Sequence, residues 1–413
     1  MRRWSGLIGF GTALGIVLAL VPVVRGNIDV NEPLRKLQLR GAPAAPAALP
    51  SFDGLDLLRL DVRPTKVTTP LSQGRQAELT LDPVVQRSIH AEMEGYRIPR
   101  AGVVLMEVKT GNILAYSSYV GEGEKVDVNV RAEAPAASVF KVITGAALIE
   151  KAGLGAETEQ CYHGGKSRIA ADELEDNPRR DKWCATLGIA MGRSINVVFA
   201  RLAQKHITPE DLTAVGGAFG FGAPIPFVVP NQAPELKMPT DPVEFARASA
   251  GFYHSTLSPL AAVGLAQTVA NGGVTLEPRI IASVVKDREV LWTDDRPPRA
   301  LRRAIKPETA AELTRMMVQT VANGSAFKSF HDASGTSFLG EVTVAGKTGT
   351  LGDPDGSRLY TWFIGFAPVE APEVAVSALV VNNPSWQIKA PQLARDALRA
   401  YFARKGRKGV TAP

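Results

Sequence analysis

The stretch 341–350, Glu-Val-Thr-Val-Ala-Gly-Lys-Thr-Gly-Thr, opens with a β-rich run that predicts a strand from Glu341 to Thr348. Two more β-rich runs follow at 359–366 and 373–381, and after them apolar residues recur at helical spacing over 393–402. The C-terminal part of the chain is therefore expected to supply three strands and a closing helix.

A matching set of elements is predicted near the other end of the chain. Asp82 is a good N-cap, Pro83 suits a first helical position, and apolar residues then recur at helical spacing. The β-rich runs 102–108 and 112–119 flank a turn-like Lys-Thr-Gly and predict a hairpin. Between the two ends the chain is mostly helical. This order predicts an α+β fold, an antiparallel sheet flanked by N- and C-terminal helices, with a large and mostly helical subdomain inserted.

The N-terminus carries the pattern of a transmembrane anchor. Residues from Trp4 to Val24 include no charge and follow Arg2 and Arg3, and this length suffices to cross a hydrocarbon core of about 30 Å. A cleaved signal peptide would have a shorter apolar run with a small-x-small site at its end, and the first such site lies near 42–45. We favour an uncleaved anchor with its basic flank in the cytoplasm. With either reading, the rest of the chain is exported.

These patterns divide the chain into four parts. Residues 1–26 form the cytoplasmic tip and anchor, and 27–77 a stem that includes Gly-Ala-Pro-Ala-Ala-Pro-Ala-Ala at 41–48. Residues 78–405 form the folded domain, and 406–413 a basic tail that we interpret as solvated.

Composition limits the partners and the redox chemistry. The 413 residues carry a formal charge of +6, but Lys and Arg are scattered along the chain apart from the tail, so we expect no nucleic-acid partner. The two cysteines, Cys161 and Cys184, could close one loop in an oxidising compartment, although two separately buried thiols remain the alternative. Their spacing fits no zinc motif, so we expect no metal.

The first chemical motif is Ser138-Val139-Phe140-Lys141. On a helix, this spacing places the hydroxyl and the amine one turn apart on the same face. The apolar residues that follow would partly desolvate Lys141, and desolvation favours the neutral amine that can accept a proton from serine. Ser138 at the start of a helix would also lie where backbone N–H groups stabilise negative charge.

The tetrapeptide alone is weak evidence, because Ser-x-x-Lys also occurs at 283–286 and 325–328. The copy at 283 lies in a β-rich run, where a spacing of three puts the two side chains on opposite faces. The copy at 325 follows Asn323-Gly324, a turn sequence. Only the copy at Ser138 opens a long apolar helix.

Two further motifs follow along the chain. Ser194-Ile195-Asn196 lies between two helical patterns, and on its own Ser194 is explained equally well as an N-cap. Lys347-Thr348-Gly349-Thr350 ends the strand that begins at Glu341. Such a strand offers an ammonium group and hydroxyls to a carboxylate, while the glycine lets a substrate approach the backbone.

Two look-alikes of the last motif are set aside. Lys109-Thr110-Gly111 repeats the tripeptide, but between two strands it is turn chemistry. Gly-Lys-Thr at 346–348 resembles the end of a phosphate loop, yet Glu341 stands where that loop needs glycine and no helix follows. We therefore expect no nucleotide site and no cofactor.

The ordered set Ser-x-x-Lys, Ser-x-Asn and Lys-Thr-Gly-Thr resembles the signature of the penicillin-binding protein and serine β-lactamase superfamily. The stretches 79–83, 257–260, 270–273 and 362–366 are similar to its cell-wall transpeptidase domain. The resemblance covers roughly residues 78–405 and implies a stand-alone transpeptidase domain on a short stem.

The resemblance implies a role for each motif residue. Ser138 would attack the penultimate D-alanine carbonyl of a peptidoglycan stem peptide, with Lys141 as the base; Ser194 would relay the proton and Asn196 would orient Lys141. Substrate binding would fall to the strand motif, Lys347, Thr348, Gly349 and Thr350. The N–H groups of Ser138 and Thr350 would form the oxyanion hole.

The resemblance also implies partners and rival activities. Expected partners are peptidoglycan stem peptides, β-lactam antibiotics, the membrane and a separate glycosyltransferase. The rivals are a D,D-carboxypeptidase or a β-lactamase, which pass the acyl group to water, and a non-catalytic penicillin-binding scaffold or sensor. Between Ser194 and Lys347 we find no Glu-x-x-Leu-Asn segment of the class A deacylation type, which counts against fast hydrolysis.

Overall fold

The computed structural model describes residues 49–165, 168–384 and 388–413. The chain divides into two compact units, Met1–Leu49 and Pro50–Pro413. The first unit holds the expected anchor, which lies outside the described residues. Among the residues that are described, no helix has the length and apolar character needed to cross a bilayer.

The centre of the second unit is a five-stranded antiparallel sheet in the order β14-β15-β16-β4-β5. Its strands come from both ends of the chain, as the sequence predicts: β4 (Arg100–Glu107), β5 (Ile113–Val120), β14 (Ala345–Gly352), β15 (Leu359–Ala367) and β16 (Val374–Asn382). β14 starts four residues later than expected and includes the whole Lys347 to Thr350 motif. The motif therefore lies on an edge strand of the sheet.

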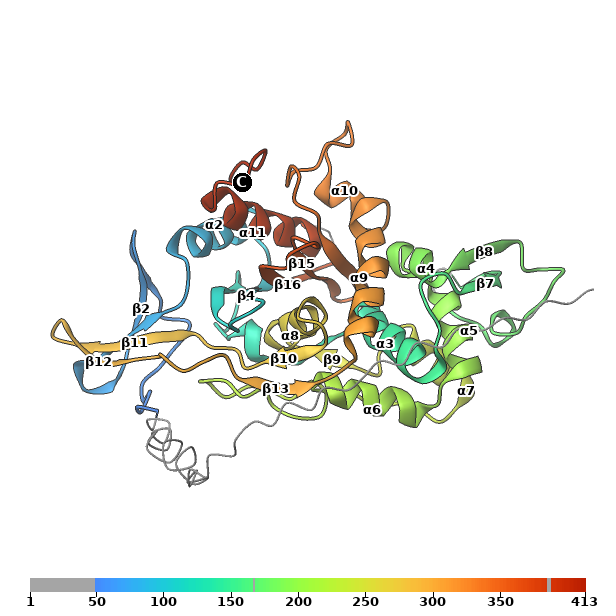
Figure 1. Ribbon diagram of the computed structural model, residues 1–413, viewed down its shortest axis with the longest axis horizontal. Coiled ribbons are helices and arrows are strands. Elements are labelled where there is room, and N and C mark those ends of the chain that lie inside the picture. The colour runs from blue at the N-terminus through green and yellow to red at the C-terminus, as the bar shows by residue number, and fades with distance from the viewer. Residues whose placement is uncertain (1–48, 166–167, 385–387) are drawn as a thin grey trace, which may run out of the picture. The chain divides into compact units, whose positions relative to one another are not determined.

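Helices cover both faces of this sheet (Figure 1). On one face, α2 (Pro83–Gly95) and α11 (Ala390–Arg404) share a buried apolar cluster with the sheet. On the other, α8 (Pro259–Ala270) joins a second and larger cluster. The Asp82 carboxylate accepts hydrogen bonds from the N–H groups of Val84 and Val85, which confirms the predicted N-cap of α2.

The inserted subdomain lies between β5 and β14 in the sequence. Its helices are α3 (Lys141–Ala152), α4 (Leu187–Arg193), α5 (Asn196–His206), α6 (Pro209–Phe219), α7 (Pro242–Ser249), α9 (Pro307–Ala322) and α10 (Phe327–Phe330). Its short strands pair as β6 (Ala134–Pro135) with β9 (Thr256–Leu257), β7 (Glu159–Tyr162) with β8 (Trp183–Thr186), and β10 (Val274–Leu276) with β13 (Ala300–Arg303).

Single 3-10 turns occur along the described part of the chain. They are η1 (Ser72–Gly74), η2 (Val128–Val130), η3 (Ala137–Phe140) and η4 (Ala171–Glu173).

A second five-stranded sheet takes up much of the segment that the sequence assigns to the stem. Its order is β1 (Asp61–Val62), β2 (Val67–Pro70), β3 (Gln76–Leu79), β11 (Ile281–Lys286) and β12 (Glu289–Thr293). Leu57, Val67 and Leu71 are buried in the large apolar cluster. The folded domain therefore begins before residue 77, the expected end of the stem. The sequence did not indicate this, because β3 pairs with β11, which comes much later in the chain.

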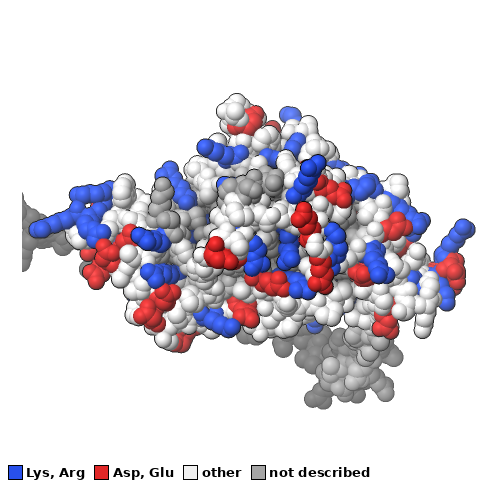
Figure 2. Space-filling view, turned by 180° about the vertical axis from the view of Figure 1, so that it is seen from behind, with Lys and Arg blue, Asp and Glu red and all other residues white. Residues whose placement is uncertain are grey.

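The last residues are mostly exposed, in agreement with the solvated tail that the sequence predicts. Two contacts join them to the domain: Arg407 pairs with Glu373, and the Arg399 guanidinium donates to the carbonyl of Ala412. On the face of the molecule in Figure 2, basic and acidic side chains are interspersed with neutral surface and form no single basic field.

Candidate active site

Ser138 and Lys141 meet at the start of α3. Ser138 lies in the 3-10 turn η3, and Lys141 is the first residue of the α-helix that continues it. The Lys141 Nζ atom lies 2.8 Å from Ser138 Oγ and is fully buried. It also lies 2.7 Å from Asn196 Oδ1 and 2.6 Å from the carbonyl oxygen of Ala250. The amine of Lys141 is thus held between two acceptors with its remaining contact on the serine.

The Ser194 hydroxyl is brought to the site by an unusual backbone conformation. Ser194 caps the C-terminus of α4 with φ 58°, in the left-handed region, and Asn196 starts α5 two residues later. Lys347 Nζ on β14 lies 3.0 Å from Ser194 Oγ and donates to the carbonyl of Thr348 at 2.9 Å. The three predicted motifs therefore converge, with Asn196 next to Lys141 and Ser194 next to Lys347.

Burial changes the acid–base chemistry of both lysines. Desolvation, followed by the repulsion from Lys347, lowers the pKa of Lys141 well below its ordinary value. Desolvation also lowers the pKa of Lys347 from 10.5 to about 7. No carboxylate contributes to either shift. The lowered pKa favours the neutral form of the amine next to Ser138, the form that can accept a proton.

The strand motif packs tightly under Ser138. A Cβ atom at Gly349 would lie 3.1 Å from the Trp362 Cβ and 3.3 Å from the Ala137 Cβ, so only glycine fits without a shift. Trp362 on β15 also donates from Nε1 to the carbonyl of Pro135 at 2.9 Å. These contacts fix the segment before Ser138 against the edge of the sheet, while Thr350 is exposed.

Two further residues shape the backbone at the nucleophile. Ala137 has φ 51°, an uncommon conformation for a residue with a side chain, directly before Ser138. Gly251 packs against it, and a Cβ there would lie 2.2 Å from the Ala137 carbonyl oxygen. Sequence reasoning missed Ala250 and Gly251. Ala250 contributes through a main-chain oxygen, which any residue could supply, so no pattern marks it.

The rejected copies of the motif have other partners. Ser283 lies on β11, where its hydroxyl donates to Glu78 at 3.1 Å. Ser325, in the loop before α10, has its Oγ 2.6 Å from the Thr348 Oγ1, so it lies beside the strand motif without a lysine contact. Lys109, in the turn between β4 and β5, donates to Asn271.

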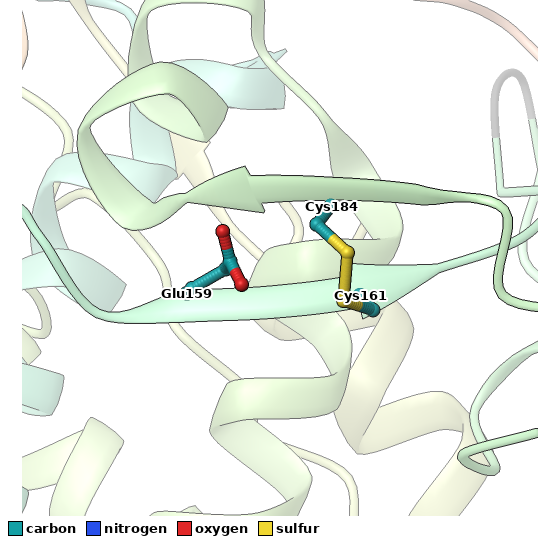
Figure 3. Close-up of side chains that lie close together, drawn as sticks. All are labelled: Glu159, Cys161 and Cys184. Carbon is teal, nitrogen blue, oxygen red and sulfur yellow. A yellow bond between two sulfur atoms is a disulfide. The ribbon is translucent and has the colours of Figure 1, made fainter. Parts of the chain in front are cut away.

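Cys161 and Cys184 face each other across the β7–β8 pair and are joined by a disulfide (Figure 3). Glu159 lies close enough for its carboxylate and the two sulfur atoms to resemble a metal cluster. Sulfur atoms that are bonded to each other are not thiolate ligands. Within the described ranges this is the one group of three such side chains, and it does not make a metal site.

Comparison with known proteins decides the family. The model of the penicillin binding protein transpeptidase domain matches residues 101–399, which hold all three motifs. The chain belongs to this family. "Peptidoglycan D,D-transpeptidase PbpA" of Mycobacterium tuberculosis is 29% identical over 350 residues, covering 75% of this chain and 68% of PbpA. "Stage V sporulation protein D" of Bacillus subtilis is 26% identical and covers 78% and 52% of the two chains.

Solved transpeptidase structures resemble the fold as well. The crystal structure of PBPA from M. tuberculosis matches with a TM-score of 0.64 and 26% identity, over 80% of this chain and 82% of that one. Its penicillin G acyl-enzyme complex matches with a TM-score of 0.61 and 25% identity, over 80% of each chain. The predicted α+β architecture of the family is therefore confirmed.

Proposed function

We propose that this chain is a serine D,D-transpeptidase that cross-links peptidoglycan stem peptides through an acyl-Ser138 intermediate and binds penicillin covalently. The observation that carries the proposal is Lys141: a buried amine, with its pKa well below the ordinary value, 2.8 Å from the Ser138 hydroxyl. The names of the relatives support it, since one is a peptidoglycan D,D-transpeptidase and the solved PBPA structures include β-lactam acyl-enzyme complexes.

Acylation begins with the hydroxyl of Ser138. Its oxygen attacks the penultimate D-alanine carbonyl carbon while its proton passes to the neutral Lys141. The negative charge on the carbonyl oxygen is stabilised by the N–H groups of Ser138 and Thr350. Asn196 keeps the Lys141 amine aimed at Ser138, in accord with its 2.7 Å contact.

Expulsion of the terminal D-alanine needs a proton on the departing nitrogen. Ser194 relays to it the proton that Lys141 took from Ser138, so Lys141 becomes neutral again, and Lys347 lies 3.0 Å from the Ser194 oxygen. Thr348 and Thr350 hold the substrate carboxylate with Lys347. The amine of a second stem peptide then attacks the acyl carbon. Its proton passes to Lys141 and from there to the Ser138 oxygen as the ester bond breaks, which restores the free serine and the neutral lysine.

The remaining parts of the proposal concern location. Residues 1–26 anchor the chain in the plasma membrane by a single span, and the catalytic domain works outside the cytoplasm, where peptidoglycan lies. A separate glycosyltransferase supplies the glycan strands whose peptides are joined.

Product analysis with purified muropeptides tests the function. The full chain is incubated with a pentapeptide muropeptide and an amine acceptor, and products are resolved by liquid chromatography and mass spectrometry. A cross-linked dimer and free D-alanine are expected, and neither from the Ser138→Ala variant. Release of D-alanine without dimer would identify a carboxypeptidase, rapid hydrolysis of penicillin a β-lactamase, and no product a scaffold.

A further inference from the structure

A fully buried arginine lies one and a half turns along the helix that begins with Asn196. Arg201 on α5 has no exposed surface, and its guanidinium binds the Asp181 carboxylate with both arms, at 2.9 and 3.0 Å. It also donates to the carbonyl oxygens of Cys161 and Glu173, at 2.9 and 2.8 Å. This rigid planar fork pairs with both oxygens of one carboxylate and holds further acceptors in a fixed geometry, which the single ammonium group of lysine does not provide.

All these partners lie in one segment, which we call the cystine loop: residues 161–184, described at 161–165 and 168–184. The disulfide between Cys161 and Cys184 closes it, beside α4 and α5 in Figure 1. Within it, His163 Nδ1 lies 2.5 Å from Asp181 Oδ1, and the side chains of both residues are buried. Arg201, first among several partners, holds the pKa of Asp181 well below its usual range, which favours the ionised carboxylate.

A second arginine ties the same loop to the other acceptor of Lys141. Arg247 on α7 donates from Nε and from a terminal nitrogen to the carbonyl of Ile169, at 2.9 and 2.7 Å. Ala250 follows directly after the end of α7, and its carbonyl oxygen accepts from Lys141. Between the two arginines, Ile169 and Leu174 of the loop pack against Ala200, Ala246 and Ala250 in one apolar cluster.

The cystine loop therefore joins the two segments that hold the amine of Lys141. Helix α5 contributes the Asn196 side chain and α7 leads to the Ala250 carbonyl, and neither acceptor belongs to the helix that carries Lys141. We propose that Arg201 is a positioning residue for Lys141: through the cystine loop it sets the spacing between α5 and the end of α7. This inference rests on the proposed acylation of Ser138.

The consequence of loosening the loop follows from what surrounds Lys141. The groups around its amine are the Ser138 hydroxyl, the Asn196 amide oxygen, the Ala250 carbonyl and, 5.8 Å away, the Phe199 ring; the one charge that shifts its pKa is Lys347. Desolvation is the main cause of the lowered pKa. If α5 and α7 separate, water reaches the amine and its pKa rises. Less of the amine is then neutral at pH 7, so the acidic limb of the acylation profile moves to higher pH.

The test compares Arg201→Lys on α5 with Arg180→Lys, the same change within the cystine loop, where Arg180 is exposed and pairs with Asp172. Acylation rates with a fluorescent penicillin are measured at low ligand concentration from about pH 5 to about pH 10, because this rate reports the free enzyme. For Arg201→Lys we expect a loss of about tenfold at pH 7, as for small displacements of catalytic groups, with partial recovery at high pH. Arg180→Lys should follow the wild type.

A second variant keeps the inference testable if Arg201→Lys does not fold. Cys161→Ala/Cys184→Ala opens the loop while leaving Arg201 intact, and should move the acidic limb in the same direction by a smaller amount. In the wild type, dithiothreitol, which supplies two electrons and two protons to the disulfide and becomes a cyclic disulfide, should reproduce that shift. The double variant should not respond to it.

Two results must be kept apart. If the variants melt at lower temperature but acylate with the wild-type rate and pH profile, Arg201 is a structural residue and the inference is wrong. If the wild type itself does not label, the proposed function is at fault, and the role of Arg201 falls with it.

Discussion

Replacing Lys347 with methionine removes a buried charge while keeping a side chain of similar length, and the structure predicts that this makes the protein more stable at low pH. Lys347 has no exposed surface, and loss of hydration lowers its pKa from 10.5 to about 7. Below pH 7 the side chain is cationic in both the folded and unfolded chains, but only the folded chain holds the charge away from water.

The magnitude follows from that pKa difference. A fall from 10.5 to about 7 corresponds to about 5 kcal/mol of folding free energy below pH 7, since one pKa unit is worth about 1.4 kcal/mol. Against this, Lys347→Met loses the contacts to Ser194 Oγ and the Thr348 carbonyl, worth about 1 kcal/mol each. At pH 6 the free energy of unfolding of the variant should therefore be about 3 kcal/mol larger than that of the wild type.

The sign should reverse at high pH. Between pH 7 and 10.5 the unfolded chain binds a proton on Lys347 that the folded chain has lost, so the stability of the wild type rises with pH in this window. Near pH 9 the remaining cost of the lysine has fallen to about 2 kcal/mol, which equals the loss of the two hydrogen bonds. Above that pH the methionine variant should be the less stable protein.

Urea unfolding at pH 6 and pH 10 measures both effects. The control is Lys328→Met, an exposed lysine in the short helix near the strand motif, which should change the free energy of unfolding little at either pH. If Lys347→Met is destabilised equally at both pH values, the Lys347 charge is compensated in the folded protein, and the reasoning from desolvation is wrong.

Three more predictions concern named side chains. Lys141→Arg should abolish penicillin acylation, since a guanidinium stays protonated, whereas Lys347→Arg should mainly weaken binding of the substrate. Stopped-flow acylation kinetics separate the two effects, and near-normal acylation by Lys141→Arg would rule out Lys141 as the base. Ser138→Ala should take up no fluorescent penicillin, and in the wild type the adduct should map by mass spectrometry to the peptide that contains Ser138. Burial, and next the charge of Asp396, raise the pKa of Glu92 from 4.5 to about 8, so its neutral form is favoured in the folded protein. Glu92→Gln should then gain stability relative to the wild type as pH rises from 5 to 8, by about 2 kcal/mol once solvent screening is allowed for, and a gain that does not grow with pH in thermal melts would contradict this.

The parts of the fold that were predictable are those whose pattern is local. The strands of the central sheet are long apolar runs, and the cap at Asp82 lies within three residues of its partners. The second sheet escaped prediction because β1 to β3 are short and their partner β11 is remote in sequence. Arg201 escaped for a related reason: on an amphipathic helix a lone arginine is expected in solvent, and its partners, Asp181 and the carbonyls of Cys161 and Glu173, are distant in sequence.

The same distinction applies to the site. Residues that act through their side chains, such as Ser138 or Lys347, form a recognisable motif because the chemistry requires those residue types. Ala250 acts through its carbonyl and Ala137 through its backbone angle, so neither needs a particular side chain. The motifs predict Asn196 next to Lys141, but they could not predict the main-chain contributions of Ala250 and Ala137.

Several costs to stability fall together at this site. Ala137 and Ser194 both have left-handed backbone angles, of a kind that costs about 1 kcal/mol or more for a residue with a side chain. Lys141 and Lys347 are also fully buried, and no carboxylate among the described residues pairs with either. Each of these features also makes the chemistry possible. The backbone at Ala137 and Ser194 places the hydroxyls of Ser138 and Ser194 next to the amines of Lys141 and Lys347, and burial lowers the pKa of both amines. A site relaxed to ordinary angles and solvated charges would be more stable, but Lys141 would be protonated at neutral pH and Ser138 would have no base. The apolar clusters on both faces of the sheet supply the stability that offsets these costs.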